Sequence, residues 1–502
     1  MTVTAGPDVL VGTWLDATVR DRPDAVAIEY GDARITYREL DATAASMARG
    51  LYARGVRRGD VVASLSENHP APVALLFACA RLGAALFPLN WRLAPAEIRV
   101  QLELVRARLL VVSPRWSSRR DDVVRAAVRD VVGPDDLLTG GPTRVTDTPD
   151  PDDPVLVIAT SGSTGVPKAV ALSHANCHWT NESLAAVVPI GPDDGVLQVL
   201  PQFHVGGWNV QPLLAWRRGA RVVLEADFDA ERALEIIDQG RVRSMMGVPT
   251  TYLLLAQSPR FASTDLGRLR EVVVGGAVMP EHLAARWVER GVRVVQGYGL
   301  TEAAPNVCCL RPEEMADHAG SVGRPYPFVE VALYDPTSDS FVDGPGEGEL
   351  CVRGPNVFRG YLHDPESTRA AFTGEWLRTG DVASRDAAGF YRVVGRIKEM
   401  YVSGGENVYP AEVERVLDAY PGVLDATVVP VPDDRWGEVG VAYLVLAPGA
   451  SAGVDELRAH LRRELAAYKA PREFRVVESL PRTAVGKLDR AALASRARGE
   501  TR

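Results

Sequence analysis

One stretch of nine residues concentrates groups that bind phosphate. Residues 160–168 read Thr-Ser-Gly-Ser-Thr-Gly-Val-Pro-Lys and contain four hydroxyl groups, two glycines and one lysine. Glycine lets the backbone fold tightly around an anion, hydroxyl and amide groups donate hydrogen bonds to phosphate oxygens, and the lysine supplies a positive charge. The composition therefore indicates a loop that binds a polyphosphate.

Two other interpretations of residues 160–168 fit the sequence less well. A flexible serine–glycine linker rarely follows an apolar run such as Val155–Ala159, which is long enough for a buried strand. The Walker P-loop places its lysine directly before a serine or threonine that binds magnesium, whereas Ala169 follows Lys168 here. The next residues, Val170 and Leu172, alternate as in a strand, so the loop is predicted to lie at the tip of a hairpin. A magnesium ligand must then come from another part of the chain.

The composition restricts the classes of protein to which the chain can belong. At 502 residues the chain is too long for one ordinary core, so two or more domains are expected. Hydrophobic residues make up 46% and charged residues 24%, which is usual for a soluble globular protein. The net charge of -9 argues against a nucleic-acid-binding protein.

Cysteine usage and hydropathy indicate a cytoplasmic protein. The five cysteines have no metal-ligand spacing, and the adjacent Cys308 and Cys309 cannot form an ordinary disulfide, so a reducing compartment is predicted. The first residues lack the basic and apolar segments of a signal peptide. No apolar run approaches the roughly 18 residues needed to span a bilayer, so stable membrane insertion is not expected.

The segments that must position the glycine-rich stretch alternate between helix and strand patterns. Thr36 and Glu39 form a capping-box pattern, which predicts the start of a helix. The strand and helix patterns that follow lie at residues 60–63, 71–82, 84–88, from about 95 onward, and 109–112. This alternation predicts an α/β protein with a largely parallel sheet.

Two later strand patterns lead directly into glycine-containing loops. Residues 272–274 precede Gly275-Gly276-Ala277, and residues 292–295 precede the loop Gly297-Tyr298-Gly299-Leu300-Thr301-Glu302. In open α/β sheets the ligand crevice lies beyond the carboxyl ends of the strands. These loops are therefore predicted to contact a nucleotide.

The composition changes near residue 330. Short strand patterns separated by glycine, proline and aspartate follow, and beyond Lys398 the pattern is that of a compact α+β unit. We therefore predict one domain at residues 1–397 and a second at residues 398–502. A loop in the second domain carries Lys487, far in sequence from the first lysine.

Taken in order, these motifs resemble those of the adenylate-forming acyl-CoA synthetases, a superfamily that also contains free-standing adenylation domains and firefly luciferase. The resemblance extends from about residue 12 to residue 493. It implies an α/β fold with a large multi-sheet N-terminal domain that binds ATP and the acyl group. It also implies a small, mobile α+β C-terminal domain that carries the catalytic lysine, with the active site between the two domains.

The resemblance assigns roles to residues that match the family's motifs. Thr301 would contact the α-phosphate, and Glu302 would hold magnesium. Asp381 would bind the ribose hydroxyls, with Arg396 as a second contact to ribose or phosphate. The ATP site implied in this way comprises Thr160, Ser161, Gly162, Ser163, Thr164, Gly165, Gly275, Gly276, Ala277, Gly297, Tyr298, Gly299, Asp381 and Arg396. The implied catalytic residues are Lys487, Glu302, Thr301 and Lys168.

Further positions concern the movement of the C-terminal domain and departures from the family's pattern. Lys398 lies at the family's hinge position, where many members have aspartate. The segment Ser403-Gly404-Gly405 is similar to the one that lines the CoA channel after the domain rotates. Ala169 stands where glycine is usual, and Ser163 where many members have threonine. Neither departure removes a charged group, so catalysis is expected to be intact.

The resemblance also locates the acyl pocket. Its implied residues are His204, Val205, Gly206 and Trp208. We expect His204 to line the pocket and Trp208 to lie either in the core or in a pocket wall. Relatives that activate amino acids have an aspartate shortly after the phenylalanine of this segment, and residues 203–209 contain none. An apolar acid is therefore expected, either aromatic or of short to medium chain length.

The charges of the substrates explain why such a site needs cations. A carboxylic acid is already ionised at pH 7, so no general base is needed. At close range and an effective dielectric near 20, each pair of unit charges on the acid and the triphosphate repels by about 4 kcal/mol. Lys487, Lys168 and magnesium on Glu302 would offset that repulsion in the transition state.

The predicted activity is ATP-dependent formation of an acyl-AMP with release of pyrophosphate, followed by transfer of the acyl group to the thiol of CoA. The alternative is a free-standing adenylating enzyme that passes the activated acid, or another oxyanion, to a carrier protein or a non-CoA nucleophile. A non-catalytic nucleotide-binding protein is disfavoured because Lys487, Glu302 and Lys168 are all present. The predicted cofactors are ATP, Mg2+ and CoA, and the predicted partner is a small carboxylic acid. An acyl carrier protein and a homodimer are left open, and nucleic acid is not expected.

Overall fold

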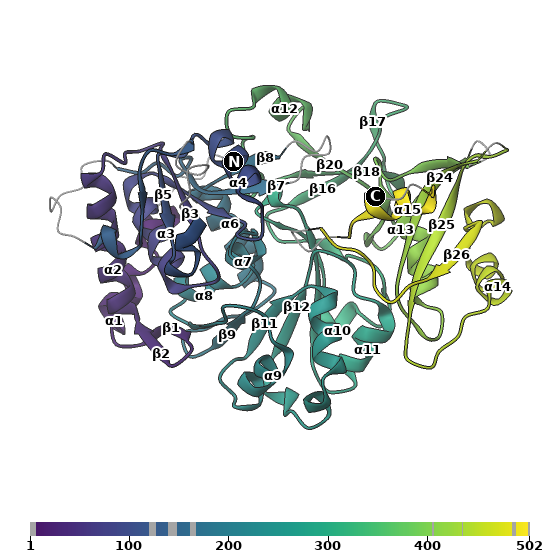
Figure 1. The fold of residues 1–502 in the computed structure, drawn as a ribbon, viewed down its shortest axis with the longest axis horizontal. Helices are drawn as coiled ribbons and strands as arrows, with labels where there is room; N and C mark the ends of the chain where they lie inside the picture. The colour runs from purple at the N-terminus through teal and green to yellow at the C-terminus, as the bar shows by residue number, and fades with distance from the viewer. Residues whose placement is uncertain are drawn as a thin grey trace. The chain divides into compact units, whose positions relative to one another are not determined.

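Figure 1 shows the computed structural model, which describes residues 7–119, 127–138, 148–160, 167–403, 406–433, 435–483 and 488–499. The first of two compact units comprises residues 1–279, 285–331 and 352–377, and the second comprises residues 280–284, 332–351 and 378–502. Helices and several sheets are combined, which confirms the predicted α/β class. The domain boundary expected at Lys398 stays a prediction. Within the described residues, no helix is both long and apolar enough to cross a lipid bilayer.

One six-stranded sheet ends at the glycine-rich stretch. Its strand order is β6-β5-β3-β4-β7-β8. The strands are β3 (Val61–Leu65), β4 (Ala85–Leu89), β5 (Leu109–Val112), β6 (Val131–Val132), β7 (Pro154–Thr160) and β8 (Lys168–Ser173). Neighbouring strands are parallel except β7 and β8, which form an antiparallel pair with Thr160 opposite Lys168. The predicted hairpin is thereby confirmed.

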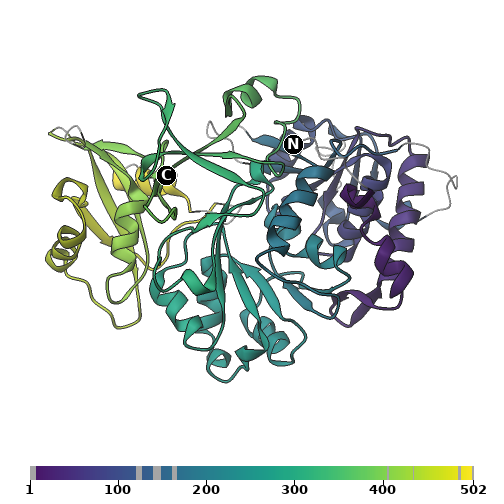
Figure 2. The ribbon, with the colours of Figure 1, turned by 180° about the vertical axis from the view of Figure 1, so that it is seen from behind.

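Helix α2 (Tyr37–Ala53) begins where the capping box predicted. Glu39 N donates to Thr36 Oγ1 at 3.2 Å, and Thr36 N donates to Glu39 Oε2 at 2.8 Å. Helix α2 packs on α3 (Pro70–Leu82), and the two helices lie side by side in both views (Figure 1, Figure 2). Most side chains of α3 are buried, as expected for a helix that is apolar on all sides and lies inside the core.

The largest sheet has nine strands in the order β15-β14-β13-β12-β11-β9-β10-β1-β2. These strands are β1 (Val26–Tyr30), β2 (Ala33–Thr36), β9 (Gly195–Gln198), β10 (Arg221–Leu224), β11 (Ser244–Gly247), β12 (Glu271–Val274), β13 (Val294–Gly299), β14 (Asn306–Leu310) and β15 (Arg324–Pro325). The strands from β13 to β1 are parallel to their neighbours, and antiparallel strands flank them on both sides. The predicted, largely parallel sheet is confirmed.

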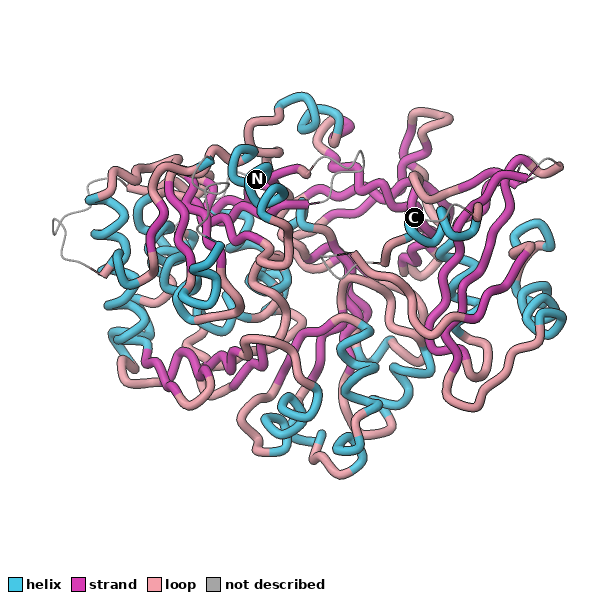
Figure 3. The backbone as a smooth tube through the Cα atoms, in the orientation of Figure 1, coloured by secondary structure: helices cyan, strands magenta, loops and turns pink. Residues whose placement is uncertain are grey.

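Further helices alternate with these strands, as the cyan and magenta segments of Figure 3 show. They are α1 (Asp16–Asp21), α4 (Pro95–Leu104), α6 (His174–Ala185), α7 (Gly206–Asn209), α8 (Pro212–Arg217), α9 (Ala230–Asp238), α10 (Pro249–Gln257), α11 (Glu281–Val288) and α12 (Pro365–Ala370). The predicted helix near residue 95 is α4. Its buried Ile98 and Leu102 pack with Phe87 and Val157 in one core of the first unit.

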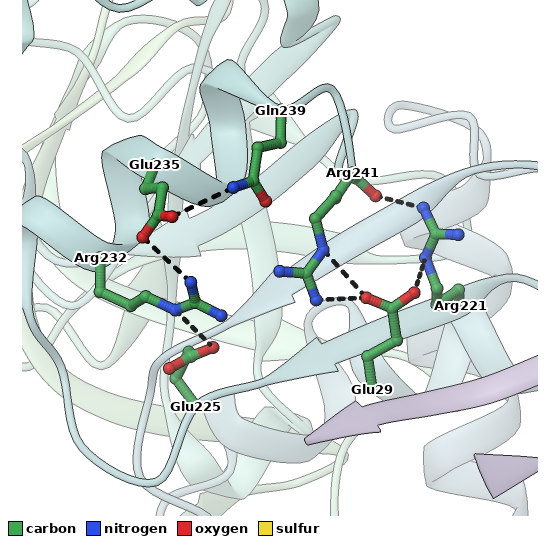
Figure 4. A network of polar contacts seen from close by, with 7 residues as sticks. All are labelled: Glu29, Arg221, Glu225, Arg232, Glu235, Gln239 and Arg241. Atoms are coloured by element: carbon green, nitrogen blue, oxygen red, sulfur yellow. Dashed lines mark hydrogen bonds and ion pairs between the residues drawn. The ribbon is translucent and has the colours of Figure 1, made fainter. Parts of the chain in front are cut away.

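A buried glutamate ties the N-terminal strand to the rest of the nine-stranded sheet (Figure 4). Glu29, on β1, accepts a hydrogen bond from Arg241 Nε at 3.0 Å and lies 3.4 Å from Arg221 Nε. A buried charge is costly unless it is paired and hydrogen-bonded, and the two arginines meet that need. Figure 4 also shows the neighbouring group of Glu225, Arg232, Glu235 and Gln239.

A sheet of five strands forms most of the C-terminal part of the second unit. Its order is β23-β22-β25-β24, and β26 pairs with β25. The elements are β22 (Tyr401–Ser403), β23 (Glu406–Val408), α13 (Pro410–Asp418), β24 (Val423–Asp433), β25 (Gly437–Leu446), α14 (Val454–Glu464), β26 (Glu473–Val476) and α15 (Arg490–Ala497). Side chains of α13 and α14 share one core with the sheet. The α+β pattern is confirmed, and α14 ends at Glu464 because Leu465 is extended.

Another sheet also has six strands. Its order is β17-β16-β18-β20-β19, and β21 pairs with β20. The strands are β16 (Glu330–Asp335), β17 (Ser340–Phe341), β18 (Gly346–Arg353), β19 (Phe372–Thr373), β20 (Trp376–Arg385) and β21 (Tyr391–Arg396). They account for the short strand patterns that begin near residue 330.

All five cysteines are free thiols, and all five are buried. Burial raises the pKa of each thiol, to about 12 for Cys177, Cys309 and Cys351. The adjacent Cys308 and Cys309 form no disulfide, as their spacing predicted.

Candidate functional site

The glycine loops predicted to contact the nucleotide follow two adjacent strands. β12 and β13 are parallel neighbours with Val273 opposite Val295, so residues 275–277 and 297–299 lie at the same edge of the sheet. The sequence predicted a loop from Gly297 onward, and this was wrong for residues 297–299. They continue β13 because β14 pairs with them in antiparallel orientation, placing Gly297 opposite Cys309.

A buried glutamine, Gln296, holds these two segments together. Its Nε2 donates to Ala277 O at 3.1 Å and to Gly297 O at 2.9 Å, and its Oε1 accepts from Met279 N at 2.8 Å. Both ends of the amide are therefore bonded, which fixes residues 275–279 beside β13. The sequence alone does not point to Gln296, because a single glutamine inside an apolar strand carries no spacing signal.

The two glycines of β13 differ in the room around them. A Cβ at Gly299 would lie 1.6 Å from the carbonyl oxygen of Pro305, so only glycine fits there. A Cβ at Gly297 would have Val274 O, at 3.4 Å, as its nearest neighbour, which is an ordinary contact distance. Gly299 is therefore required by the fold, whereas the space beside Gly297 is open to a small group.

Thr301 and Glu302 are separated from β13 only by Leu300 and lie in the short 3-10 helix η7 (Thr301–Ala303). Tyr361 Oη donates to Glu302 Oε1 at 3.0 Å, and Phe358 N donates to Glu302 O at 2.8 Å. Burial and the adjacent charge of Glu302 raise the pKa of Tyr361, so its hydroxyl keeps the proton that it donates. Glu302 is thus held by hydrogen bonds at both its backbone carbonyl and its side-chain carboxylate.

The surroundings of Glu302 fit a magnesium ion shared with substrate phosphates. Its second carboxylate oxygen, Oε2, accepts no hydrogen bond from the residues that the structure describes. No three His, Cys, Asp or Glu side chains among those residues are grouped to hold a metal ion by themselves. Magnesium commonly binds one or two carboxylates together with phosphate oxygens, so a single available carboxylate is compatible with it.

Lys168, the first residue of β8, lies on the face of the same tyrosine. Its Nζ is 4.6 Å from the centroid of the Tyr361 ring. Thr160 Oγ1 donates to Lys168 O at 3.5 Å across the hairpin. Ser161, Gly162, Ser163, Thr164 and Gly165 lie outside the described residues. The sequence alone does not point to Tyr361 either, because the residue that it contacts, Glu302, is 59 positions away.

The residues expected to line the acyl pocket lie at the start of α7. His204 is half-buried, with its ring 4.7 Å from that of Phe203, and Val205 is buried. Trp208 is fully buried, and its Nε1 donates to Gln202 O. The sequence left open whether Trp208 lies in the core or in a pocket wall, and in the structure it lies in the core.

Met246, on β11, connects this segment to the first glycine loop. Its Sδ lies 3.7 Å from the place that a Cβ at Gly206 would occupy, and its Cε lies 2.7 Å from the place of a Cβ at Gly275. One flexible side chain therefore separates a residue assigned to the acyl pocket from a residue assigned to ATP. Nothing in the sequence distinguishes Met246, since a methionine in an apolar strand indicates core packing.

In the second unit, Asp381 lies on β20 and Arg396 lies opposite it on β21. Lys398 is exposed in the turn between β21 and β22, and Ser403 is buried in β22. Gly404 and Gly405 lie outside the described residues. The roles expected for all six residues stay predictions.

Lys487 lies outside the described residues, but the chain on both sides of its loop is anchored within the second unit. Arg482 and Leu488 form an antiparallel bridge. Arg490, the first residue of α15, donates from Nη2 to Glu414 at 2.8 Å and from Nη1 to Thr427 at 2.8 Å. The loop that carries Lys487 therefore starts and ends at fixed points.

Comparisons with known proteins add a family assignment. Residues 15–362 match the family model of the AMP-binding enzyme, and residues 412–487 match that of the AMP-binding enzyme C-terminal domain. A feruloyl-CoA synthase from an Amycolatopsis species is 41% identical over 484 residues, which cover 95% of this chain and 97% of that protein.

Two solved structures are similar over nearly their full length. The O-succinylbenzoate CoA synthetase of Bacillus subtilis, in complex with ATP and a magnesium ion, superposes with a TM-score of 0.85 at 32% identity, covering 96% of this chain and 99% of that one. An amide bond synthetase from Marinactinospora thermotolerans superposes with a TM-score of 0.90 at 30% identity, covering 98% and 100%.

Proposed function

The chain belongs to the family of AMP-binding enzymes, and we propose that the acid it activates is an aryl-substituted carboxylic acid. The enzyme is an ATP-dependent acid–thiol ligase. It forms an acyl-AMP with release of pyrophosphate, and the thiol of CoA then displaces AMP. The resemblance that the sequence motifs indicated is confirmed.

The observation that carries the proposed residue roles is the placement of Lys168, the last residue of the glycine-rich stretch, and Glu302 around one tyrosine ring. In this proposal Lys168 contacts the terminal phosphates, and the hydroxyl of Thr301 donates to the α-phosphate. Magnesium, when bound at Glu302, would neutralise phosphate charge. These groups lower the repulsion between the acid and the triphosphate at the moment of attack.

The second unit completes the proposal. Asp381 and Arg396 bind the ribose, and Lys487 stabilises the charge that develops at the α-phosphate. Rotation at Lys398 then withdraws Lys487 and brings Ser403-Gly404-Gly405 to the CoA channel. Lys487 therefore acts in the first half-reaction only.

The proposed substrate class is supported by the pocket residues and by two relatives. Residues 203–209 contain no acidic side chain to bind an ammonium group. Gly206, Gly297 and the flexible Met246 are small or adaptable, which suits a flat ring. A relative is named a feruloyl-CoA synthase and a neighbour an O-succinylbenzoate CoA synthetase, and both names denote aryl acids.

A panel of acids tests this proposal. Pyrophosphate release should be measured with ferulate, indoleacetate, benzoate, hexanoate, octanoate and phenylalanine, each with and without CoA. We expect kcat/KM for the best aryl acid to exceed that of the best straight-chain acid by about tenfold or more, the size of effect that pocket contacts commonly give. Equal values for both classes would contradict an aryl substrate, and activity with phenylalanine would contradict the absence of an ammonium site.

A second acceptor is favoured by the likeness to an amide bond synthetase. If an amine replaces the thiol, the same acyl-AMP yields an amide. Mass spectrometry of reactions that contain CoA, an amine or both would distinguish the products, and we expect the thioester to dominate when both are present. An acyl carrier protein as acceptor, a homodimer and a cytoplasmic location stay predictions.

A further inference from the structure

We propose that Tyr361 is a positioning residue. It keeps the cation of Lys168 and the carboxylate of Glu302 apart and holds both where they can contact the nucleotide. Residues 356–362, here called the strap, include Tyr361 and fix its position. The inference rests on the proposed roles of Lys168 and Glu302 in binding ATP, and it assigns a role to a segment that those roles do not include.

Tyr361 offers each charge the part of its side chain that suits it. The face of an aromatic ring is negative and attracts a cation, and Lys168 Nζ lies 4.6 Å from the ring centroid. The hydroxyl donates to an anion, and Oη lies 3.0 Å from Glu302 Oε1. One rigid side chain therefore contacts both groups.

The same arrangement prevents the two charges from neutralising each other. The structure shows no ion pair between the described side chains of Lys168 and Glu302. A lysine packed against a ring has fewer accessible rotamers than a free one. Because each charge contacts the tyrosine and not its opposite, both remain available to phosphate and to a metal ion.

The strap is fastened to the segment that carries Glu302. Asn356 Nδ2 donates to Ala303 O at 2.8 Å and to Asn306 O at 2.9 Å, so one side chain brackets η7. Phe358 N donates to Glu302 O at 2.8 Å. Asn356 and Phe358 are both nearly fully buried, which makes these bonds costly to break.

The strap is also fastened to the strand that carries Lys168. Leu362 N donates to Ala169 O at 2.8 Å, and Tyr361 forms a bridge with Val170. Tyr361 N donates to Thr368 Oγ1 at 2.9 Å. The strap therefore joins β8 to η7, and Tyr361 lies where these two attachments meet.

Two substitutions separate the functions of the ring and the hydroxyl. Tyr361→Phe keeps the ring beneath Lys168 and removes the bond to Glu302, whereas Tyr361→Leu removes both. Tyr420→Phe is a matched control, because Tyr420 Oη donates to Glu456 at 3.1 Å in the second unit. Calorimetry should measure binding of a non-hydrolysable ATP analogue in Mg2+ and in EDTA, with thermal unfolding of each variant as a check of folding.

We expect Tyr361→Phe to weaken binding of the Mg2+-loaded analogue by about tenfold, the effect of losing one hydrogen bond to a charged group. Its binding in EDTA should stay within about twofold of the parent's, since the ring still holds Lys168. Tyr361→Leu should weaken binding in both conditions, and Tyr420→Phe in neither. If Tyr361→Leu fails to fold, the comparison of Tyr361→Phe in Mg2+ and in EDTA tests the inference by itself.

Glu302→Gln and Lys168→Ala distinguish failure of the inference from failure of the proposed roles. If Glu302→Gln binds the Mg2+-loaded analogue as the parent does, the metal role proposed for Glu302 is wrong. If Glu302→Gln weakens that binding and Tyr361→Phe does not, the roles stand and Tyr361 is not a positioning residue. Equal loss for Tyr361→Phe in Mg2+ and in EDTA would also overturn the inference.

Discussion

Asp381 and Arg396 face each other across the antiparallel strands β20 and β21, with Arg396 Nε 2.9 Å from Asp381 Oδ1. The two side chains differ in burial, since that of Asp381 is 7% exposed and that of Arg396 is 61% exposed. Asp381 is also fixed through its backbone, because its N–H donates to Thr379 Oγ1 at 3.1 Å. The carboxylate therefore has a fixed place, and its partner can be displaced toward a ligand.

The Asp381–Arg396 pair gives a first prediction about ribose binding. Asp381→Asn should raise KM for ATP by about tenfold, because a hydrogen bond to a charged acceptor is weakened. Arg396→Ala removes this ion pair from a nearly buried carboxylate, and we expect a loss of about 1 kcal/mol in the free energy of unfolding, a small value because the exposed guanidinium is screened by water. Urea denaturation and ATP kinetics check both values. An unchanged KM for ATP in both variants would show that this pair does not bind the ribose.

The second prediction concerns Lys487 and the two half-reactions. Lys487→Ala should slow formation of acyl-AMP by about 100-fold or more, the loss found when one charge-stabilising donor is removed from a transition state. Thioester formation from supplied acyl-AMP should stay within about threefold of the parent rate, since rotation is proposed to remove Lys487 from that step. Pyrophosphate release and thioester absorbance measure the two steps separately. Equal losses in both would show that the lysine is not confined to adenylation.

The third prediction uses the two glycines of β13 as a matched pair. Gly299→Ala should lower stability by more than about 3 kcal/mol or prevent folding, because its Cβ would overlap Pro305 O. Gly297→Ala should fold normally and narrow the proposed pocket, so that kcat/KM falls more for bulky acids than for small ones. Thermal unfolding and the acid panel measure these effects. Normal stability of Gly299→Ala would contradict the close approach to Pro305.

The fourth prediction is a pH dependence of stability that arises at His174. This residue is fully buried, and burial lowers its pKa to about 4, while Val11 N donates to its Nδ1 at 3.1 Å. The unfolded state therefore binds the proton more tightly, so the contribution of His174 is complete above about pH 6.5 and is lost as the pH falls toward 4. Between pH 7.5 and pH 5 this loss amounts to about 2 kcal/mol.

His174→Gln is the variant that isolates this effect. Glutamine keeps an acceptor for Val11 and has no titratable proton, so the difference in unfolding free energy between pH 7.5 and pH 5 should be smaller in the variant by about 2 kcal/mol. Urea denaturation at the two pH values measures it. The same pH dependence in parent and variant would show that His174 does not contribute.

Local patterns predicted the elements that hold the site. The capping box of Thr36 and Glu39 and the hairpin that pairs Thr160 with Lys168 are both present, since each depends on residues close in sequence. Adjacent strands β12 and β13 bring their two glycine segments to one edge, as the rule for parallel sheets predicts. The resemblance then supplied the family, which local patterns alone did not.

The rest of the site depends on partners that are distant in sequence. β13 runs on through Gly299 because β14 pairs with it, and no local signal in the glycine-rich segment indicates that partner. The contact of Tyr361 with Glu302, the position of Met246 between Gly206 and Gly275, and the bonds of Gln296 all require the folded chain. In the sequence, such residues cannot be distinguished from ordinary turn or core residues, because their partners come close only in the folded chain.

The burial of the five thiols has a consequence for an enzyme that makes reactive acyl-adenylates. A thiol attacks an activated acyl group as its thiolate, and burial both hides the sulfur atoms and keeps them protonated. The five cysteines therefore do not compete with coenzyme A for the acyl-adenylate. The acyl group of the adenylate is therefore not transferred to a cysteine of the enzyme before coenzyme A arrives.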